Sequence, residues 1–337
     1  MKLSFDQLSA CIHGAIELTR NPDDSVQIHR FTDAQKAIYT PKDAGYFASN
    51  QSANTTFDIC TDADSITLTF SGRCREQCPE IPADILVNGV LQHHVQATRT
   101  AVSSYAVVPY DPVSFTIPLP GGEKRVTVYF GYITTVDSLT VDLPDGAFVR
   151  TYSPKRTMVS FGDSITQGLS AQFPSMSYIS QLSRKLDAAV YNFGIGGERF
   201  RADKIVPGTY PECDLVTVAY GTNDFGQKKS CTADFEANMA AFFRLLHEVY
   251  PETPTFVLLP LWRVDETELH NDIPTLQAVR DRIRQEVQQY ANITVIDCKN
   301  FVPHLPAFFA DGIVHPNDLG MTHYATNLYL AIKEVLK

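Results

Sequence analysis

The sequence predicts an α/β protein in which an antiparallel β-sandwich or jelly-roll domain precedes a parallel sheet with helices on both faces. Two changes along the chain support this division. The first part contains short runs of alternating apolar and polar residues, separated by turn-forming residues. The second part contains nearly continuous apolar runs that alternate with helix-length amphipathic segments. Strands of a parallel sheet have this continuous apolar pattern because both of their faces are buried.

The predicted β-sandwich domain extends over residues 1–150. Within it, the range 24–142 is rich in Val, Ile, Thr, Tyr and Phe, and Gly, Pro, Asn and Asp interrupt the runs. The clearest predicted strands are SITLTF at 65–70, ADILVNG at 83–89, FTIPL at 115–119 and KRVTVYFG at 124–131. Short strands at this spacing are typical of antiparallel sandwiches and jelly rolls. The segment 141–156 carries turn formers and little periodicity, so we interpret it as the interdomain linker.

The second predicted domain extends over residues 151–337 and contains a series of buried strands. They are TMVSF at 157–161, AAVYNF at 188–193, DLVTVAY at 214–220, TFVLLPL at 255–261 and ITVID at 293–297. Between them lie the helical patterns YISQLSRKLD, FEANMAAFFRLLHEVY and LQAVRDRIRQEVQQY. Ligands of such sheets bind outside the carboxyl ends of the strands. We therefore expect the functional residues in the loops that follow the strands.

The charge and cysteine content exclude several classes of partner. The 28 basic and 38 acidic residues give a net charge of -10, which repels nucleic-acid phosphates and anionic lipids. The N-terminus lacks the features of a secretory signal and no stretch is long enough to span a bilayer, so we expect a cytoplasmic protein. Seven cysteines, an odd number, favour free thiols. Cys74 and Cys78 have no second pair at ligand spacing, so we predict no metal site and no cofactor.

The loops after the predicted strands carry groups that suit acyl transfer. They are GDSITQG, GIGGERF, GTNDFG and WRVDET, with DGIVHPNDLG beyond the last strand. Acyl transfer requires a hydroxyl nucleophile, a base and preset donors for the oxyanion. Ser164 supplies a hydroxyl and His315 an imidazole base. Gly197 can present a backbone N–H without a side chain in the way, and Asn223 can present a neutral amide.

Four blocks in these loops resemble those of the SGNH hydrolases, the GDSL-type esterase and lipase superfamily. The blocks are GDSIT at 162–166, NFGIGG at 192–197, GTND at 221–224 and DGIVHPN at 311–317. The resemblance covers residues 157–335 and implies the SGNH hydrolase fold, a three-layer α/β/α flavodoxin-like parallel sheet. It further implies that Ser164 is the nucleophile and first oxyanion donor, Gly197 the second donor, Asn223 the third donor and His315 the base.

The spacing before the histidine differs from that of the family. The family places an aspartate three residues before the histidine, whereas Asp311 precedes His315 by four. On a turn-like backbone, positions three and four apart are both neighbours, so the Asp311 carboxylate can orient the imidazole. If the carboxylate does not reach, a backbone carbonyl would hold the ring and the site would be a Ser–His dyad.

Four further residues lie in or near these loops, and they are not expected to react with the substrate. We expect Asp163 and Asp224 to bind loop N–H groups rather than to take part in the reaction. Trp262 and Arg263 follow the fourth predicted strand, where two interpretations are open. They either wall the substrate pocket or anchor their own loop.

The sequence predicts a serine esterase that hydrolyses short-chain acyl esters. Short chains are favoured because no extended apolar lid segment is present. The β-sandwich before the catalytic domain resembles the architecture of carbohydrate esterase family 2, which implies acetyl esters of carbohydrates and a small-molecule or oligosaccharide partner. Two alternatives stay open: a non-catalytic carbohydrate-binding protein, and a metal-dependent phosphoester hydrolase with ligands from GD, ND and DxxxH. No oligomeric state is predicted.

Overall fold

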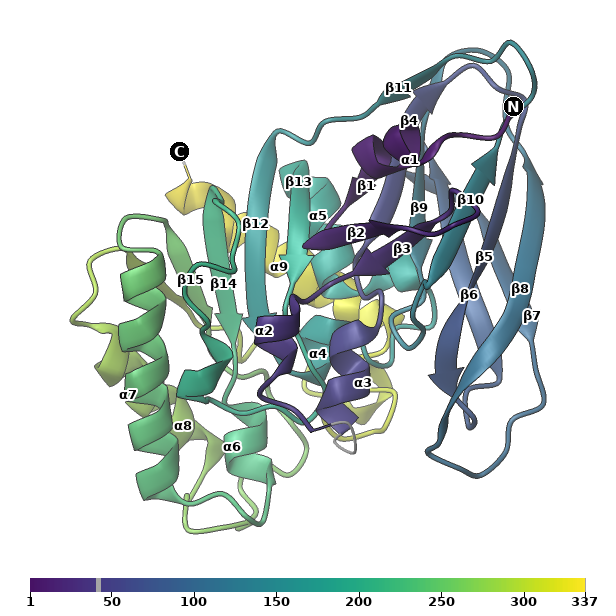
Figure 1. Cartoon of the computed structure of the whole chain (residues 1–337). Coiled ribbons are helices and arrows are strands. Elements are labelled where there is room, and N and C mark those ends of the chain that lie inside the picture. The colour runs from purple at the N-terminus through teal and green to yellow at the C-terminus, as the bar shows by residue number, and fades with distance from the viewer. Residues whose placement is uncertain (41–43, 337) are drawn as a thin grey trace.

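Two antiparallel sheets and one parallel sheet make up the protein in a computed structural model that describes residues 1–40 and 44–336 (Figure 1). Residues 41–43 and 337, which fall within the predicted domains, lie outside the described residues. The N-terminal elements are α1 (Phe5–Cys11), β1 (Ile12–His13), β2 (Glu17–Arg20), β3 (Val26–His29), α2 (Asp33–Lys36), α3 (Ala44–Asn50), β4 (Thr56–Thr61), β5 (Ser65–Arg75), β6 (Glu80–Val87), β7 (Val90–Thr98), β8 (Val107–Pro118), β9 (Lys124–Phe130), β10 (Ser138–Asp142) and β11 (Val149–Thr151).

The C-terminal elements alternate between strands and helices. They are β12 (Arg156–Gly162), α4 (Ser164–Gln167), η1 (Pro174–Met176), α5 (Tyr178–Leu186), β13 (Ala188–Asn192), η2 (Ala202–Lys204), β14 (Leu215–Ala219), α6 (Thr222–Gly226), α7 (Thr232–Val249), β15 (Thr255–Leu258), α8 (Leu276–Val287), β16 (Ile293–Ile296), η3 (Pro306–Phe308) and α9 (Asp318–Val335). Each of the five buried strands predicted for this half is present.

The N-terminal sandwich consists of two antiparallel sheets. The strand order is β2-β3-β10-β5-β8 in one sheet and β1-β4-β9-β6-β7 in the other, with β11 paired to β4. Every second residue of β5 and of β10 is buried, because one face of their sheet packs on the other sheet. Phe57, Leu68 and Val128 belong to the apolar core between them. The predicted antiparallel sandwich is confirmed, and the segment expected to be a linker contains β11.

The C-terminal sheet is parallel throughout and has the order β13-β12-β14-β15-β16. Successive residues of β12 face opposite layers. Met158 packs in a core with residues of α5 and α9, and Val159 packs in a core with residues of α7 and α8. The sheet is therefore covered on both faces, which confirms the predicted three-layer α/β/α architecture.

The strand order places a crevice at the carboxyl end of β12. Because β13 and β14 flank β12 on opposite sides, the connections that leave these strands diverge there. The GDSIT block follows β12, and the NFGIGG and GTND blocks follow β13 and β14. Three of the four blocks thus meet at one edge of the sheet for a topological reason.

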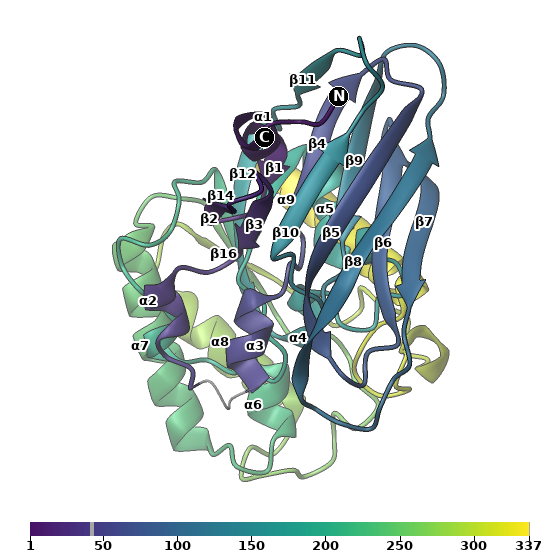
Figure 2. The ribbon, with the colours of Figure 1, turned by 45° about the vertical axis from the view of Figure 1, so that its right-hand side comes forward.

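Two short N-terminal helices pack against the parallel sheet. Figures 1 and 2 show α2 and α3 beside the α/β domain, between it and the lower end of the sandwich. Phe31, Tyr39 and Ala48 belong to the same apolar core as Val159 and Phe193. The sequence predicts only strands in the range 24–142, because helices of 4 and 7 residues show too little periodicity to be recognised. The N-terminal region therefore completes a core of the α/β domain.

Two further observations concern thiols and membranes. All seven cysteines are described and all are free thiols, as predicted. Among the residues that the structure describes, no helix combines the length and the apolarity needed to cross a bilayer.

Candidate active site

The turn between β12 and α4 fixes the position of Ser164. The strand ends at Gly162, and the Asp163 carboxylate accepts the N–H of Ile165 at 2.9 Å, which caps the helix that Ser164 begins. Gly168, with a φ of 103°, ends this helix after one turn. Ser164 is 5% exposed. The serine hydroxyl is thus held at the carboxyl edge of the sheet by a turn that is fixed at both ends.

His315 links the Ser164 hydroxyl to a carboxylate. Its Nε2 lies 2.9 Å from Ser164 Oγ, and its Nδ1 lies 2.6 Å from Asp311 Oδ2. With Nδ1–H donating to the carboxylate, Nε2 is the free acceptor for the hydroxyl proton. Residues that are 151 positions apart in the sequence therefore meet within hydrogen-bond distance.

A tight turn resolves the unusual spacing before His315. Asp311 Oδ1 accepts the N–H groups of Ile313 at 2.9 Å, Val314 at 2.9 Å and His315 at 3.1 Å, and Gly312 has a φ of 70°. Burial raises the pKa of Asp311, but these N–H bonds and the imidazole bond outweigh it and lower the pKa to about 2. One carboxylate oxygen thus holds the turn while the other reaches the ring, and the structure has a Ser–His–Asp arrangement rather than a dyad.

The loop after β13 brings unpaired backbone donors to the serine. Within the described residues, the backbone N–H groups of Ser164 and Gly197 donate to no protein acceptor. A Cβ atom on Gly196 would lie 3.7 Å from Ser164 Cβ, so this loop packs directly on the serine turn. Gly197 has a φ of 81°, a conformation that favours glycine.

Asn223 lies beside the same loop. Its Nδ2 donates to the Glu198 carbonyl at 3.0 Å, which leaves its second N–H available because an amide nitrogen has two. Glu198 directly follows Gly197, and the Gln227 amide donates to the Gly197 carbonyl at 2.7 Å. The three donor groups predicted from the sequence therefore come from three adjacent loops.

Asp163 and Asp224 are buried behind the site. Burial raises the pKa of Asp163 to about 6 and that of Asp224 to about 7. Asp224 Oδ2 accepts the N–H of Phe200 at 3.5 Å. Both carboxylates thus make contacts with loop N–H groups, of the kind expected from the sequence.

Trp262 and Arg263 make loop-anchoring contacts. The Trp262 ring stacks on His304 with centroids 4.9 Å apart and an angle of 9° between the planes. Arg263 is 8% exposed, and its guanidinium binds the Asp265 carboxylate and, at 3.1 Å, the Thr222 carbonyl. These contacts anchor the loop, and a substrate-pocket role for Trp262 and Arg263 stays a prediction. Arg263 ties the loop after β15 to α6.

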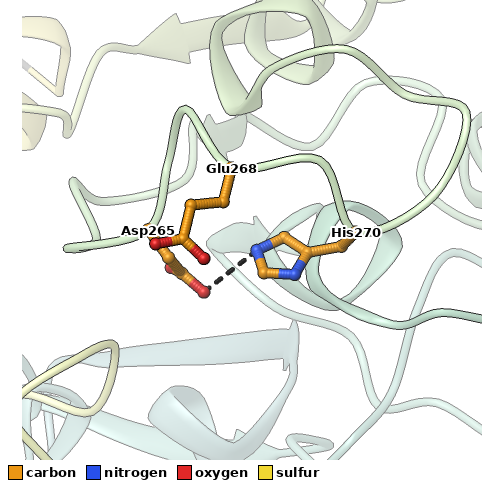
Figure 3. Close-up of side chains that lie close together, drawn as sticks. All are labelled: Asp265, Glu268 and His270. Atoms are coloured by element: carbon orange, nitrogen blue, oxygen red, sulfur yellow. Dashed lines mark ion pairs between the residues drawn. The ribbon is translucent and has the colours of Figure 1, made fainter.

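One group of side chains in the described part of the chain has the spacing of metal ligands, and it lies outside the Ser164 site (Figure 3). The potential ligand atoms of Asp265, Glu268 and His270 lie within 4.8 Å of one another. Asp265 already binds Arg263 through both carboxylate oxygens, and His270 Nε2 lies 3.0 Å from it. The guanidinium neutralises the central carboxylate, which makes this group a poor cation site.

The sequence predicts no role for two further residues at the site, Gln167 in the GDSITQG loop and Asn192 in the NFGIGG block. Gln167 Oε1 accepts the N–H of Gly196 at 2.7 Å. Asn192 Nδ2 donates to the Thr166 carbonyl at 2.7 Å, and its Oδ1 accepts the N–H of Gly194 at 2.7 Å. Both therefore fasten the loop after β13 to the serine turn. An Asn that ends a buried apolar strand is the one sequence feature that could have indicated this role.

Comparisons with known proteins bear on the family and the fold of the chain. Residues 160–323 match the GDSL-like lipase/acylhydrolase family. No curated protein matches the chain. A salicylyl-acyltransferase, SsfX3, from a tetracycline biosynthetic pathway has a similar structure, with 21% identity, a TM-score of 0.72 and coverage of 96% of this chain and 95% of that chain.

Two carbohydrate esterases are also structurally similar. A family two carbohydrate esterase from Cellvibrio japonicus has 15% identity and a TM-score of 0.66, and the match covers 99% of this chain and 97% of that chain. An acetyl xylan esterase, Est2A, from the rumen bacterium Butyrivibrio proteoclasticus has 11% identity and a TM-score of 0.65, with coverage of 100% and 98%. At these identities the similarity establishes the fold, and it extends over both the sandwich and the α/β domain.

Proposed function

We propose that the chain is an esterase with Ser164 as its nucleophile, because residues 160–323 match the GDSL-like lipase/acylhydrolase family. The observation that supports this most directly is the line of hydrogen bonds from Asp311 to His315 at 2.6 Å and from His315 to Ser164 at 2.9 Å. An imidazole held in this way is the general base that activates a serine hydroxyl.

Acylation begins when His315 Nε2 removes the Ser164 hydroxyl proton as Oγ attacks the ester carbonyl carbon. The oxyanion that forms accepts hydrogen bonds from the N–H groups of Ser164 and Gly197 and from the Asn223 amide. Asp311 stays ionised and stabilises the imidazolium. His315 then gives the proton to the leaving alcohol as the C–O bond breaks, which leaves the acyl group on Ser164.

Deacylation repeats these steps with water. His315 removes a proton from a water molecule, the hydroxide oxygen attacks the acyl carbon, and the same donors bind the second oxyanion. The carboxylic acid leaves as His315 returns the proton to Ser164 Oγ. The protein groups supply a nucleophile, a base and an oxyanion site, so the proposed reaction uses no cofactor.

The proposed substrates are short-chain acyl esters, with acetyl groups on carbohydrates as the principal class. Carbohydrate esterases are among the structural neighbours, and one of them is an acetyl xylan esterase. The sequence contains no extended apolar lid segment of the kind that a long acyl chain would require. The proposed partner is therefore a small-molecule or oligosaccharide ester.

Hydrolysis of p-nitrophenyl acetate by the wild-type protein and by Ser164→Ala, each with and without EDTA, tests the proposed reaction. We expect the wild type to be active, Ser164→Ala to lose this activity and EDTA to have no effect. Equal activity of the two proteins would eliminate the acyl-enzyme. Loss of wild-type activity on chelation would instead favour the metal-dependent alternative.

A substrate panel tests the acyl group and the alcohol separately. We expect the rate on p-nitrophenyl esters to fall steadily from acetate to octanoate. Acetylated oligosaccharides should release acetate with a higher kcat/KM than p-nitrophenyl acetate does. A preference for octanoate, or no release from any acetylated sugar, would contradict the substrate class while leaving the Ser164 chemistry in place.

A further inference from the structure

Arg30 is a fully buried cation where the sandwich meets the α/β domain. It follows β3 directly and is 1% exposed. Its guanidinium donates to the carbonyl oxygens of Gln51 at 2.9 Å and Ala48 at 2.5 Å. It also donates to the carbonyl oxygens of Asn192 at 2.6 Å and Gly194 at 2.9 Å. Asn192 ends β13, and Gly194 lies in the loop that follows it and leads to the second predicted oxyanion donor, Gly197.

The charge of Arg30 is stabilised by carbonyl dipoles, because the acceptors that its guanidinium meets in the described residues are all backbone oxygens. Burial lowers the pKa of Arg30 to about 9, so the group is still charged at neutral pH. A buried charge is costly when any of its donors is left unpaired. The planar guanidinium therefore resists any movement of the loop that would withdraw the carbonyls of Asn192 and Gly194.

A second line of hydrogen bonds starts at Gln51 and reaches the same loop. Gln51 Oε1 accepts from Gln167 Nε2 at 2.5 Å, and Gln167 Oε1 accepts from the Gly196 N–H at 2.7 Å. The Gln51 amide nitrogen donates to the Ile133 carbonyl at 2.9 Å, which fixes the direction of its amide group. Because the Gln51 carbonyl also accepts from Arg30, the two lines join in the N-terminal region.

The loop held in this way packs closely on the serine turn. A Cβ atom on Gly194 would lie 2.5 Å from the backbone nitrogen of Gln167, and one on Gly196 would lie 3.7 Å from Ser164 Cβ. Any shift of this loop therefore moves the Gly197 N–H relative to the Ser164 hydroxyl. A misplacement of about 1 Å in an active site can cost on the order of 10²-fold in rate.

We propose that Arg30 and Gln51 are positioning residues for the loop 192–197, so that the N-terminal region completes the oxyanion site. This inference rests on the proposed esterase function. Neither residue touches the ester, and each acts through the loop. Their loss should lower kcat with little change in KM, because oxyanion donors bind the transition state more strongly than the ground state.

The test compares Arg30→Ala and Gln51→Met with the wild type, using p-nitrophenyl acetate and rates expressed per folded molecule. We expect kcat to fall roughly 10- to 100-fold for Arg30→Ala and by a smaller factor for Gln51→Met, with KM within about twofold. The pH profile of kcat/KM should not move, because the His315–Asp311 pair is untouched. Methylguanidinium at millimolar concentration should restore part of the kcat of Arg30→Ala, and methylammonium should not.

Lys124→Met is the matched control. Lys124 is a second buried cation, 3% exposed, and its Nζ donates to the Ala63 carbonyl at 2.6 Å within the sandwich. We expect its loss to lower the unfolding temperature and to leave kcat within about twofold, because among the described residues its Nζ binds a carbonyl of the sandwich and not the loop 192–197. This control separates positioning from general destabilisation.

Each outcome decides the inference. Wild-type kcat in folded Arg30→Ala and Gln51→Met would overturn it and would leave the esterase function intact, since Ser164→Ala tests that function separately. If Arg30→Ala does not fold, Gln51→Met decides alone. A wild-type protein no more active than Ser164→Ala would overturn the proposed function and this inference with it.

Discussion

Two loops meet at Ser164. The contacts that hold one of them join residues close in the sequence, and those that hold the other join residues far apart in it. In the histidine loop, Asp311 binds the N–H groups two, three and four residues after it, and the Ala310 N–H donates to the His315 carbonyl at 2.7 Å. In the oxyanion loop 192–197, Arg30 binds carbonyls 162 and 164 positions away. The proposed base, His315, is therefore oriented by its own segment, whereas the loop that carries the proposed oxyanion donor Gly197 is held by a distant part of the chain.

This difference predicts two kinds of loss. Changes in the histidine loop should remove a chemical group and leave the rest of the site in place. Changes around the oxyanion loop should leave Ser164 and His315 intact and still lower turnover.

Removal of the base should cause the largest loss. We expect His315→Ala to lower kcat on p-nitrophenyl acetate by roughly 10³-fold or more, and Ser164→Ala to lower it equally, because nucleophile and base act as a unit. The double variant should be no slower than either single variant. Multiplicative losses in the double variant would show that the two side chains act independently, contrary to the 2.9 Å contact between them.

Removal of the carboxylate should be less severe. We expect Asp311→Ala to lower kcat by roughly 10²-fold, since His315 retains its backbone bond to Ala310 but loses the partner of its Nδ1. The measurement is steady-state hydrolysis at pH 7 and above. A loss as large as that of His315→Ala would show that the turn collapses without Asp311, and that local contacts alone do not hold the histidine loop.

The stability contributed by Asp311 should depend on pH in a defined direction. Its pKa in the folded protein is about 2, below the unfolded value of roughly 3.9, so its contribution is present above about pH 4 and is lost as the pH falls toward 2. The difference in unfolding temperature between the wild type and Asp311→Ala should therefore shrink over that window. A constant difference would mean that the N–H bonds of the turn do not favour the ionised carboxylate.

Loss of one proposed oxyanion donor should lower turnover while Ser164 and His315 stay in place. We expect Asn223→Ala to lower kcat on the order of 10²-fold with little change in KM. Combined with Arg30→Ala, the loss should be smaller than the product of the two single losses, because both act on one oxyanion. Unchanged kcat in Asn223→Ala would remove this residue from the site.

Replacement of a buried carboxylate behind the oxyanion loop should mainly change stability. The pKa of Asp224 is raised to about 7, so the folded protein binds its proton more tightly than the unfolded chain does, and stability falls as the pH rises from about 4 to 7. We expect Asp224→Asn to gain roughly 1–3 kcal/mol relative to the wild type between pH 5 and pH 8. Chemical denaturation at both pH values measures this gain, and an equal difference at the two values would contradict it.

Local sequence patterns were enough to locate the clearest strands of both domains and the residue types at the edge of the parallel sheet. Apolar alternation marks β5, and continuous apolar runs mark β12 and β14, because strand periodicity is a local property of the chain. The positions of Ser164 and His315 followed from short blocks placed after such strands. These features need no knowledge of distant contacts, so the sequence alone sufficed.

The tertiary structure decided the contacts that connect distant segments. Only the folded turn showed that Asp311 reaches His315 across four positions, and only packing showed that Arg263 binds Asp265 and Thr222. The role proposed for Arg30 depends on partners that no local pattern reveals. A buried charge must be stabilised by polar groups, and here these are carbonyl oxygens that only the fold brings to the guanidinium. Local periodicity fixes where strands and loops occur, whereas the burial of polar groups fixes how those loops are held.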